Sequence, residues 1–546
     1  MKKLVAVLGA LIMLLGALPA SAAGWNSSVA FTNQVVSSPT TGGGYPVPAG
    51  QTAPNPGTCR MGNYNSNRSE SWVAVQPGTE NLVGASKFFF ENYSTFYDFH
   101  LGSYTIPNGV PAQNTHIPGY DCISTGTQDM PPSWTNNTDP NVAFDSQGRV
   151  YQVTLPFNAF WANMHPNGAI GVVYSDDLGR NWKVGNGGQY LDLLPNSTSL
   201  SHGDVVDKQW LAVNAIKGHK NQDHVYAMWT RFDGMTGKIH VAVSRDRGLS
   251  FSDAATLTQP QATGPGNTFI IPSIDAAGTV YVSFATFPVN GAATSIYVTR
   301  STDDGVTWGP FVQVVGGLQT IASLPNTRFR DGILENFAAS PTYAGHLYVV
   351  WENWDGTQMD VMFSQSTDGG NTWSAPAKVN DNIDSPGVPT DQFQPAVAAG
   401  PNGAVAVVFY DRRQACPSDN SILSADQGRT NFCINTSLQA YKDSGAGAVA
   451  VGSNVRISQF TWDPEQPGQS VGGLSQYPCA GHRDPCPNGR GFIGDYFGLA
   501  VSGKNIYALF VSTHYPSTVT ADGGGPVYYQ QQVLATVPRS NIASGY

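Results

Sequence analysis

Short runs of alternating apolar and polar residues recur along most of the chain, and each run leads through a turn into a second apolar run. Examples are VAFDSQGRVYQV, PSIDAAGTVYVSF and PAVAAGPNGAVAVVFY. A period of two is typical of half-buried β-strands, and Asp, Asn and Gly between the runs allow tight hairpins. No segment has a convincing helical period. The unit recurs at Ser71–Ser86, Pro140–Thr154, Trp210–Trp229, Ile271–Phe284, Phe337–Trp351, Pro395–Tyr410 and Phe497–Phe510.

These repeats predict an all-β fold, a β-propeller built from four-stranded antiparallel blades. A single blade cannot bury both of its faces, so several blades must pack around an axis. Seven repeats indicate seven blades. Six blades is the alternative, because the first and last repeats could belong to one blade. We expect the propeller to cover residues 69–546, after an irregular arm at 23–68 that is rich in Gly, Pro, Ser, Asn and Thr.

Four eight-residue segments share a pattern close to Ser-x-Asp-x-Gly-x-Thr-Trp. The Asp can cap its own turn by accepting backbone N–H groups, the Gly permits a positive φ, and the aromatic residue can fold back onto the blade. The segments begin 69, 57 and 65 residues apart, and a degenerate fifth copy is YKDSGAG. The four are SDDLGRNW from Ser175, SRDRGLSF from Ser244, STDDGVTW from Ser301 and STDGGNTW from Ser366.

These segments resemble the Asp-box, or BNR, repeats of the sialidase (neuraminidase) superfamily and related propeller glycosidases. The resemblance implies a propeller whose boxes join the third and fourth strands of a blade, on the face away from the active site. Non-catalytic propellers carry the same motif, so it indicates fold more than function. The sequence also departs from sialidases, because the Arg-Ile-Pro motif of their first arginine is absent and the early Arg68 lies in NRSESW.

If the boxes occupy one face, two sets of segments build the other face: those that lead into each first strand and those that link second to third strands. Charged and aromatic residues gather in both sets, which predicts a ligand site at that end of the axis. The alternative is that these residues form ion pairs between neighbouring blades. They lie in VVDKQWLAV (Asp207, Lys208), RFRDGILENF (Arg328, Arg330, Glu335), DQFQPAV (Asp391, Gln394), IGDYFGLAV (Asp495, Tyr496), WENWDG (Glu352) and FYDRR (Tyr410, Asp411, Arg412).

A glycosidase needs a proton donor and a second group that acts as nucleophile or base. The sialidase resemblance implies an arginine triad that clamps a substrate carboxylate, a Tyr–Glu nucleophile and an Asp acid. Arginine binds a carboxylate through two parallel hydrogen bonds, and tyrosine needs a neighbouring base before it attacks. The candidates are Arg328, Arg330 and Arg412 for the clamp, Tyr410 or Tyr496 with Glu335 or Glu352 for the nucleophile, Asp207, Asp411 or Asp495 for the acid, and Lys208, Asp391 and Gln394 for further substrate contacts.

The resulting hypothesis is a secreted, monomeric, sialidase-like glycoside hydrolase that acts on an external glycan or polysaccharide without a cofactor or metal. One alternative is a non-catalytic propeller that binds glycan or protein. Another is a polysaccharide lyase with Tyr496 or Tyr410 as base and Lys208 neutralising a uronate. The sequence contains no GxSxG, HExxH or phosphate-loop motif. A formal net charge of −10 and only 12% charged residues argue against nucleic-acid and anionic-membrane partners.

The N-terminus is typical of a signal peptide at residues 1–22. Lys2 and Lys3 precede an apolar stretch at 4–18, and Ala-Ser-Ala at 20–22 forms a cleavage pattern. A retained anchor is the alternative, but the stretch is short for a span of roughly 20 residues.

Six cysteines in an exported chain indicate disulfides. Nearness in the sequence favours Cys416–Cys433 and Cys479–Cys486, which leaves Cys59–Cys122. A zinc site is the competing interpretation, although no CxxC pair accompanies these cysteines.

Overall fold

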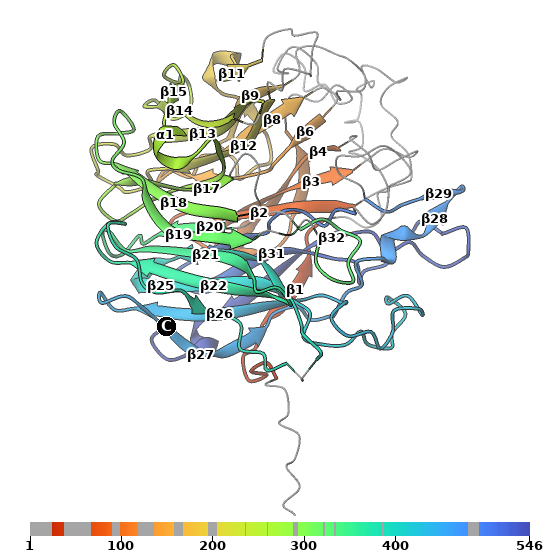
Figure 1. Cartoon of the computed structure of the whole chain (residues 1–546). Helices are drawn as coiled ribbons and strands as arrows, with labels where there is room; N and C mark the ends of the chain where they lie inside the picture. Colours follow the sequence, from red (N-terminus) through yellow and green to blue (C-terminus); the bar gives the residue numbers. More distant parts are fainter. Residues whose placement is uncertain are drawn as a thin grey trace, which may run out of the picture.

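Within the described residues, the regular secondary structure of this computed structural model is almost entirely β-strand, as the alternating pattern predicts (Figure 1). Two single-turn helices, α1 (Pro260–Thr263) and α2 (Arg539–Ile542), interrupt it. No helix in the described part of the chain has the length and apolar character needed to cross a membrane. The structure describes residues 24–37, 67–89, 99–117, 136–157, 168–194, 205–234, 236–258, 260–287, 293–319, 321, 323–331, 335–384, 387–478 and 491–546.

The strands form successive antiparallel groups, most of them four-stranded, and within most groups the strands lie in chain order. The first group contains β2 (Arg68–Val75), β3 (Leu82–Phe89), β4 (Phe99–Ile106) and β5 (Gln113–His116). The second contains β6 (Asn136–Thr138), β7 (Ala143–Phe144), β8 (Val150–Phe157), β9 (Ala169–Ser175) and β10 (Lys183–Val184), with β11 (Asp192–Leu193) also on β9.

The next two groups share one eight-stranded sheet, because Gly237 and Gly266 make a single parallel bridge between them. One group is β12 (Val205–Val213), β13 (Val225–Asp233), β14 (Thr236–Ser244) and β15 (Ala255–Thr256). The other is β16 (Gly266–Ile274), β17 (Val280–Phe287), β18 (Ala293–Ser301) and β19 (Val312–Gln319).

Three further sheets complete the arrangement. The first contains β20 (Glu335–Ala339), β21 (Leu347–Trp354), β22 (Met359–Ser366) and β23 (Ala377–Lys378). The second contains β24 (Gln392–Ala399), β25 (Ala404–Asp411), β26 (Asn435–Asp443) and β27 (Ala448–Arg456). The third contains β30 (Gly498–Val501), β31 (Asn505–Ser512) and β32 (Gln531–Pro538), together with β1 (Thr32–Val35). A small hairpin, β28 (Ser470–Val471) and β29 (Leu474–Ser475), stands apart (Figure 1).

Strand β1 differs from the expectation of an irregular arm at 23–68. Thr32 pairs with Thr536 and Val35 with Val533, so β1 is the outer strand of the last sheet. Strand β1, near the start of the described chain, and β32, near its end, therefore belong to one sheet, in which β32 lies between β1 and β31 (Figure 1).

The first strand of each group contacts the first strand of the next group. The contacts run from β2 to β7, β12, β16, β20, β24 and β30 and back to β2. At their meeting point the rings of Trp72 and Trp210 lie 4.6 Å apart, and the ring of Tyr496 packs 5.0 Å from Trp210. Apolar residues from neighbouring sheets fill the space between the sheets.

The four predicted box segments each follow a third strand, namely β9, β14, β18 or β22, and they share one hydrogen-bond pattern. In the third copy Ser301 Oγ donates to Asp303 Oδ1 at 2.8 Å, Gly305 N donates to Ser301 Oγ at 2.9 Å, and Thr307 N donates to Asp303 Oδ1 at 2.8 Å. Gly305 has a φ of 80°, as the motif requires. The other copies repeat these bonds from Ser175, Ser244 and Ser366.

The predicted Cys416–Cys433 disulfide is confirmed. It closes the segment between β25 and β26, and both cysteines are buried. The other two predicted pairs involve cysteines outside the described residues.

Candidate functional site

Four first strands carry the same β-bulge. Their pairing with the second strand shifts between Ser69 and Trp72 on β2, and at the corresponding points of β12, β16 and β24. A positive φ at a non-glycine residue is uncommon and costs on the order of 1–3 kcal/mol, and bulges often re-aim side chains beside functional sites. The residues with positive φ at these bulges are Glu70, Lys208, Phe269 and Gln394.

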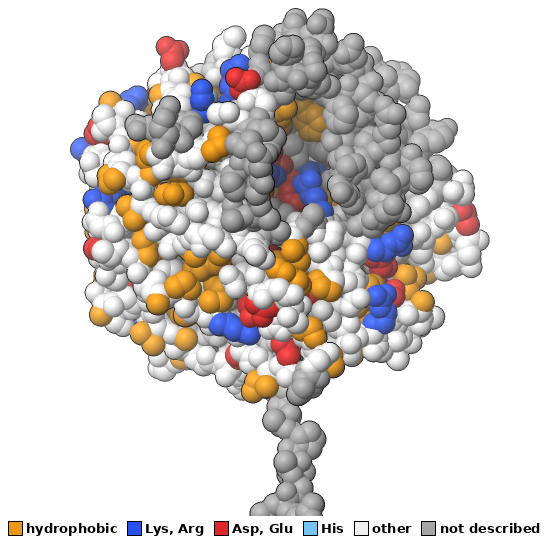
Figure 2. All heavy atoms as spheres, viewed as in Figure 1, with side chains coloured by type: hydrophobic (Ala, Val, Ile, Leu, Met, Phe, Trp, Pro, Cys, Tyr) orange, Lys and Arg blue, Asp and Glu red, His pale blue; other side chains and the backbone are white. Residues whose placement is uncertain are grey.

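A network of ion pairs lies where these bulges meet. Lys208 Nζ is 3.2 Å from Asp139 Oδ2 and 3.1 Å from Asp495 Oδ2. Arg330 also binds Asp495, from Nε at 2.9 Å and from Nη2 at 2.6 Å. Figure 2 shows acidic and basic side chains together in a hollow of the molecular face, close to the position of β2 in Figure 1.

The network continues onto the first sheet. Lys87 Nζ on β3 is 2.9 Å from Glu70 Oε2 on β2. The hydroxyl of Thr138 donates to Asp139 Oδ1 at 2.8 Å and is 3.4 Å from Glu70 Oε2. We call Glu70, Lys87, Asp139, Asp207, Lys208, Arg330 and Asp495 the axial cluster.

Electrostatics within the axial cluster separates the carboxyl groups. Burial raises the pKa of Glu70 to about 7, against the attraction of Lys87. Burial also raises the pKa of Asp207, and the charge of Asp139 adds to that effect. For Asp495 burial is outweighed by Arg330 and Lys208, which hold its pKa well below the ordinary value. The cluster therefore combines an ionised carboxylate with carboxyl groups that retain protons more readily.

A second pair of carboxyl groups lies beside the axial cluster. Gln394 joins them, because its backbone N–H donates to Glu352 Oε1 and its side-chain Nε2 is 3.5 Å from Asp331 Oδ1. Gln394 Nε2 also donates to the carbonyl oxygen of Gly494 at 2.9 Å, next to Asp495. Burial raises the pKa of Asp331 to about 7, and burial and the charge of Asp331 raise that of Glu352 well above its ordinary value.

Several predicted site residues instead make contacts that join strands and loops. Arg412 is fully buried, and its Nη1 is 2.9 Å from Asp391 Oδ2 and 3.0 Å from the carbonyl oxygen of Pro325. Arg412 also binds the carbonyl of Asn431 in the disulfide-closed segment. Asp411 accepts hydrogen bonds from Arg413 and from Ser437, at 2.8 Å each.

The axial cluster also does not include three further predicted site residues, which are Tyr410, Glu335 and Arg328. The hydroxyl of Tyr410 accepts a hydrogen bond from Val511 N at 3.1 Å, and burial raises its pKa above the ordinary value. Burial is the main cause that raises the pKa of Glu335 well above its ordinary value. Arg328, whose side chain is 66% exposed, is 3.4 Å from Glu465.

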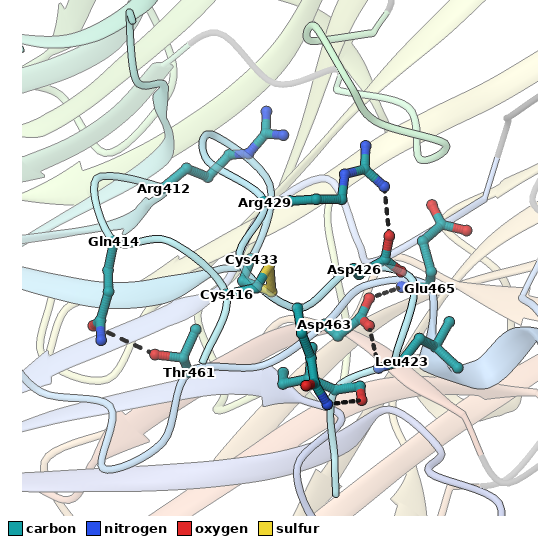
Figure 3. The surroundings of a disulfide bond; sticks show 12 residues. Arg412, Gln414, Cys416, Leu423, Asp426, Arg429, Cys433, Thr461, Asp463 and Glu465 are labelled. Carbon is teal, nitrogen blue, oxygen red and sulfur yellow. Dashed lines mark hydrogen bonds and ion pairs between the residues drawn. A yellow bond between two sulfur atoms is a disulfide. The ribbon is translucent and has the colours of Figure 1, made fainter. Parts of the chain in front are cut away.

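The surroundings of the disulfide hold a further group of acids (Figure 3). Asp463 accepts hydrogen bonds from the backbone N–H groups of Leu423 at 3.0 Å and Glu465 at 2.8 Å. Arg429 reaches toward Asp426 in the same view and is 2.5 Å from it. No group of His, Cys, Asp and Glu residues within the described ranges has the arrangement of a metal site.

The structure therefore brings Asp207, Lys208, Arg330, Asp495 and, through its ring contacts, Tyr496 to one place. Sequence analysis did not select the other cluster members, which are Glu70, Lys87 and Asp139. Each is a single charged residue in or next to a strand of the first two groups. Glu70 carries a local signal, because an apolar residue would fit the alternation with Trp72 and Ala74.

No family model matches the chain, and no curated protein matches it. Solved structures with a similar fold include a Hadza microbial sialidase (13% identity, 82% of this chain and 75% of that chain, TM-score 0.40). They also include an α-L-arabinanase of Penicillium chrysogenum, with 13% identity, 74% of this chain and 94% of that chain covered, and a TM-score of 0.36. A third is an ulvan lyase, with 11% identity, 82% of this chain and 92% of that chain covered, and a TM-score of 0.40.

Proposed function

We propose that the protein is an exported glycoside hydrolase, sialidase-like in architecture, that cleaves an external glycan at the axial cluster. The observation that carries the proposal is that the ammonium group of Lys208 lies between two carboxylates, Asp139 and Asp495, at 3.2 and 3.1 Å. A third carboxyl group, Asp207, is adjacent and half-buried. Glycosidases use a pair of carboxyl groups roughly 5–10 Å apart. Asp207 accepts a hydrogen bond from the backbone N–H of Lys208 at 2.8 Å, which keeps it beside the two carboxylates that share the ammonium group.

The proposed architecture is a closed propeller of seven blades with Asp-box turns. The contacts between successive first strands, which return from β30 to β2, support the ring. Strand β1 would close the last blade by pairing with β32. The repeated Ser–Asp–Gly hydrogen bonds after third strands support the box turns.

The proposed chemistry assigns different roles to two carboxyl groups. Asp207 donates the proton to the leaving oxygen, because its pKa is raised and it is the most accessible carboxyl of the cluster. Asp495 remains ionised and stabilises the positive charge that develops on the sugar ring. Water then attacks the ring carbon and gives its proton to the deprotonated Asp207, which restores the acid. Lys208 and Arg330 hold Asp495 in place, so they are positioning residues.

The experiment is a hydrolysis assay of the full mature chain on a glycan panel, with release of reducing sugar as readout. Asp207→Asn and Asp495→Asn should each lower kcat by at least about 100-fold with an unchanged fold. Asp411→Asn is the control, because Asp411 binds Arg413 and Ser437 instead. Hydrolysis that survives both cluster substitutions would exclude this site as the catalytic one.

A non-catalytic glycan- or protein-binding propeller is the second candidate. It is favoured by the burial of Glu70, Asp139 and Asp495, each at most 3% exposed. Glycan binding without turnover of any panel member would establish it. The lyase alternative requires Tyr496 or Tyr410 as base, and burial raises the pKa of both hydroxyl groups above the ordinary value, which disfavours that role.

A further inference from the structure

The cations of the axial cluster are already bound to carboxylates of the protein. Lys87 binds Glu70, and Lys208 binds both Asp139 and Asp495. Arg330 uses both Nε and Nη2 on Asp495, which is the two-point geometry that a substrate carboxylate would otherwise use. Arg68 on β2 lies over the ring of Phe88, 4.8 Å from its centroid.

Every cation of the axial cluster has a carboxyl partner within the cluster. These ion pairs join three cations to three carboxylates, and Asp207 adds a further carboxyl group. A substrate carboxylate could make this two-point contact with Nε and Nη2 of Arg330 only by displacing Asp495. Like charges placed close together in a desolvated site are strongly unfavourable. A sugar without a carboxylate meets no such penalty.

An aromatic ring stands beside the cluster. Phe269 is half-buried, and the ammonium group of Lys208 lies 5.5 Å from its ring centroid. The bulge on β16 gives Phe269 a φ of 54°, an unusual conformation for a bulky residue. The ring of Phe287 packs edge-on against it at 5.7 Å and supports its orientation. The other ring beside these cations, Phe492, is fully buried between Lys87 and Arg330.

We propose that the glycan accepted by this site is neutral, with the apolar face of a sugar ring packed on Phe269, and that sialic acids and uronates are excluded. The proposal rests on the proposed function for the location of the site. The C–H face of a sugar suits an aromatic ring, whereas the surrounding acids suit hydroxyl donors. Phe269 is thus a specificity-determining residue.

The test compares neutral and anionic forms of one polymer on the full mature chain. The probes are polygalacturonate and its fully methyl-esterified form, together with arabinan, galactan and sialyllactose. Equilibrium binding and sugar release are both measured, at about 50 and 500 mM salt. We expect neutral probes to be preferred by at least about 10-fold, with little dependence on salt.

Two variants sharpen the result. Phe269→Ala should weaken binding of the preferred neutral probe by about 10-fold, whereas Phe269→Tyr, which keeps the ring, should bind like the wild type. Asp495→Asn removes the carboxylate that occupies Nε and Nη2 of Arg330. The variant should therefore bind polygalacturonate and its methyl-esterified form with more similar affinities than the wild type does, or should bind polygalacturonate more tightly.

The outcomes separate the two proposals. Preferred binding of polygalacturonate or sialyllactose by the wild type overturns the inference, as does the absence of binding to every neutral probe. Equal affinity of Phe269→Ala and wild type for the neutral probe also overturns it. Neutral binding that depends on Phe269, without sugar release from any probe, supports the inference and refutes the hydrolase.

Discussion

Arg330 donates two hydrogen bonds to Asp495, from Nε at 2.9 Å and from Nη2 at 2.6 Å. The carboxylate is almost inaccessible, with its side chain 3% exposed, whereas the arginine side chain is 39% exposed. The guanidinium group thus links a buried acid to the surface of the hollow. Because the two bonds are parallel, they fix the orientation of the carboxylate as well as its charge.

Replacing Arg330 by lysine should reduce activity without removing the positive charge. A lysine cannot form two parallel hydrogen bonds, so Asp495 would lose its fixed orientation. We expect kcat/KM on the preferred glycan to fall by about 10- to 100-fold, the equivalent of one lost charge-assisted hydrogen bond. Steady-state kinetics measures the loss.

Arg328→Lys is the matched control, because Arg328 is two residues away and its exposed side chain pairs with Glu465 at 3.4 Å. Its kcat/KM should stay within about twofold of the wild type, as expected for an exposed ion pair. Equal losses in the two variants would show that the Arg330–Asp495 geometry has no special role.

Glu70 should give the protein a stability that decreases with pH. Its pKa in the folded protein is raised to about 7 from an ordinary value of 4.5, chiefly by burial. A group with a raised pKa contributes its full stability below about pH 4.5 and loses it as the pH rises through about 7. The expected loss is on the order of 3 kcal/mol. Urea unfolding at pH 5, 6, 7 and 8 measures it.

Glu70→Gln removes the titrating group and should flatten this part of the pH profile. Because Gln resembles the protonated Glu70, the variant should match the wild type near pH 5 and exceed it near pH 8, although it also replaces the carboxylate at 2.9 Å from Lys87 by a neutral amide. Glu70→Gln with Lys87→Met separates the two effects, because it removes both charges. An unchanged slope in both variants would mean that Glu70 does not titrate in this range.

The fold was accessible from the sequence because its signals are local. Alternation marks strands, and the Ser–Asp–Gly spacing of the boxes sets hydrogen bonds within a few residues, as in Ser301–Asp303. The site could be predicted only in part from the sequence, because it depends on the direction of the side chain at the end of each strand. Asp411 is the last residue of β25 and Asp495 lies shortly before β30, yet Asp411 binds Arg413 whereas Asp495 binds Arg330.

The cluster residues that sequence reasoning missed depend on backbone conformation. Glu70 is a single acid in a strand, and simple alternation does not show that a bulge gives it a φ of 50°. Lys87 and Asp139 have equally ordinary sequence surroundings and acquire their roles through partners on other strands. Such long-range pairing has no signature in one sequence.

Arg412 should be essential for stability rather than for chemistry. It is fully buried, and its partners Asp391, Pro325 and Asn431 come from three separate segments. Arg412→Ala leaves the carboxylate of Asp391 buried without its cation, which costs about 3–5 kcal/mol. We expect a large loss in the urea midpoint. The double variant Arg412→Met with Asp391→Leu should recover much of the stability, which a catalytic role for Arg412 would not explain.

The box turns should stabilise the blades through one carboxylate each. Asp303 accepts hydrogen bonds from Thr307 N at 2.8 Å and from Ser301 Oγ at 2.8 Å, and these bonds with that of the Thr307 hydroxyl lower its pKa. Asp303→Ala leaves the turn N–H without a partner, and we expect a loss of about 1 kcal/mol in unfolding free energy. Thr302→Ala is the control, because Thr302 is exposed in the same turn and should change stability by less than about 0.5 kcal/mol. Because the box lies after a third strand, away from the axial cluster, Asp303→Ala should also keep the wild-type kcat on the preferred glycan. A loss of activity at full stability would place this turn at the substrate, against the proposed orientation of the blades.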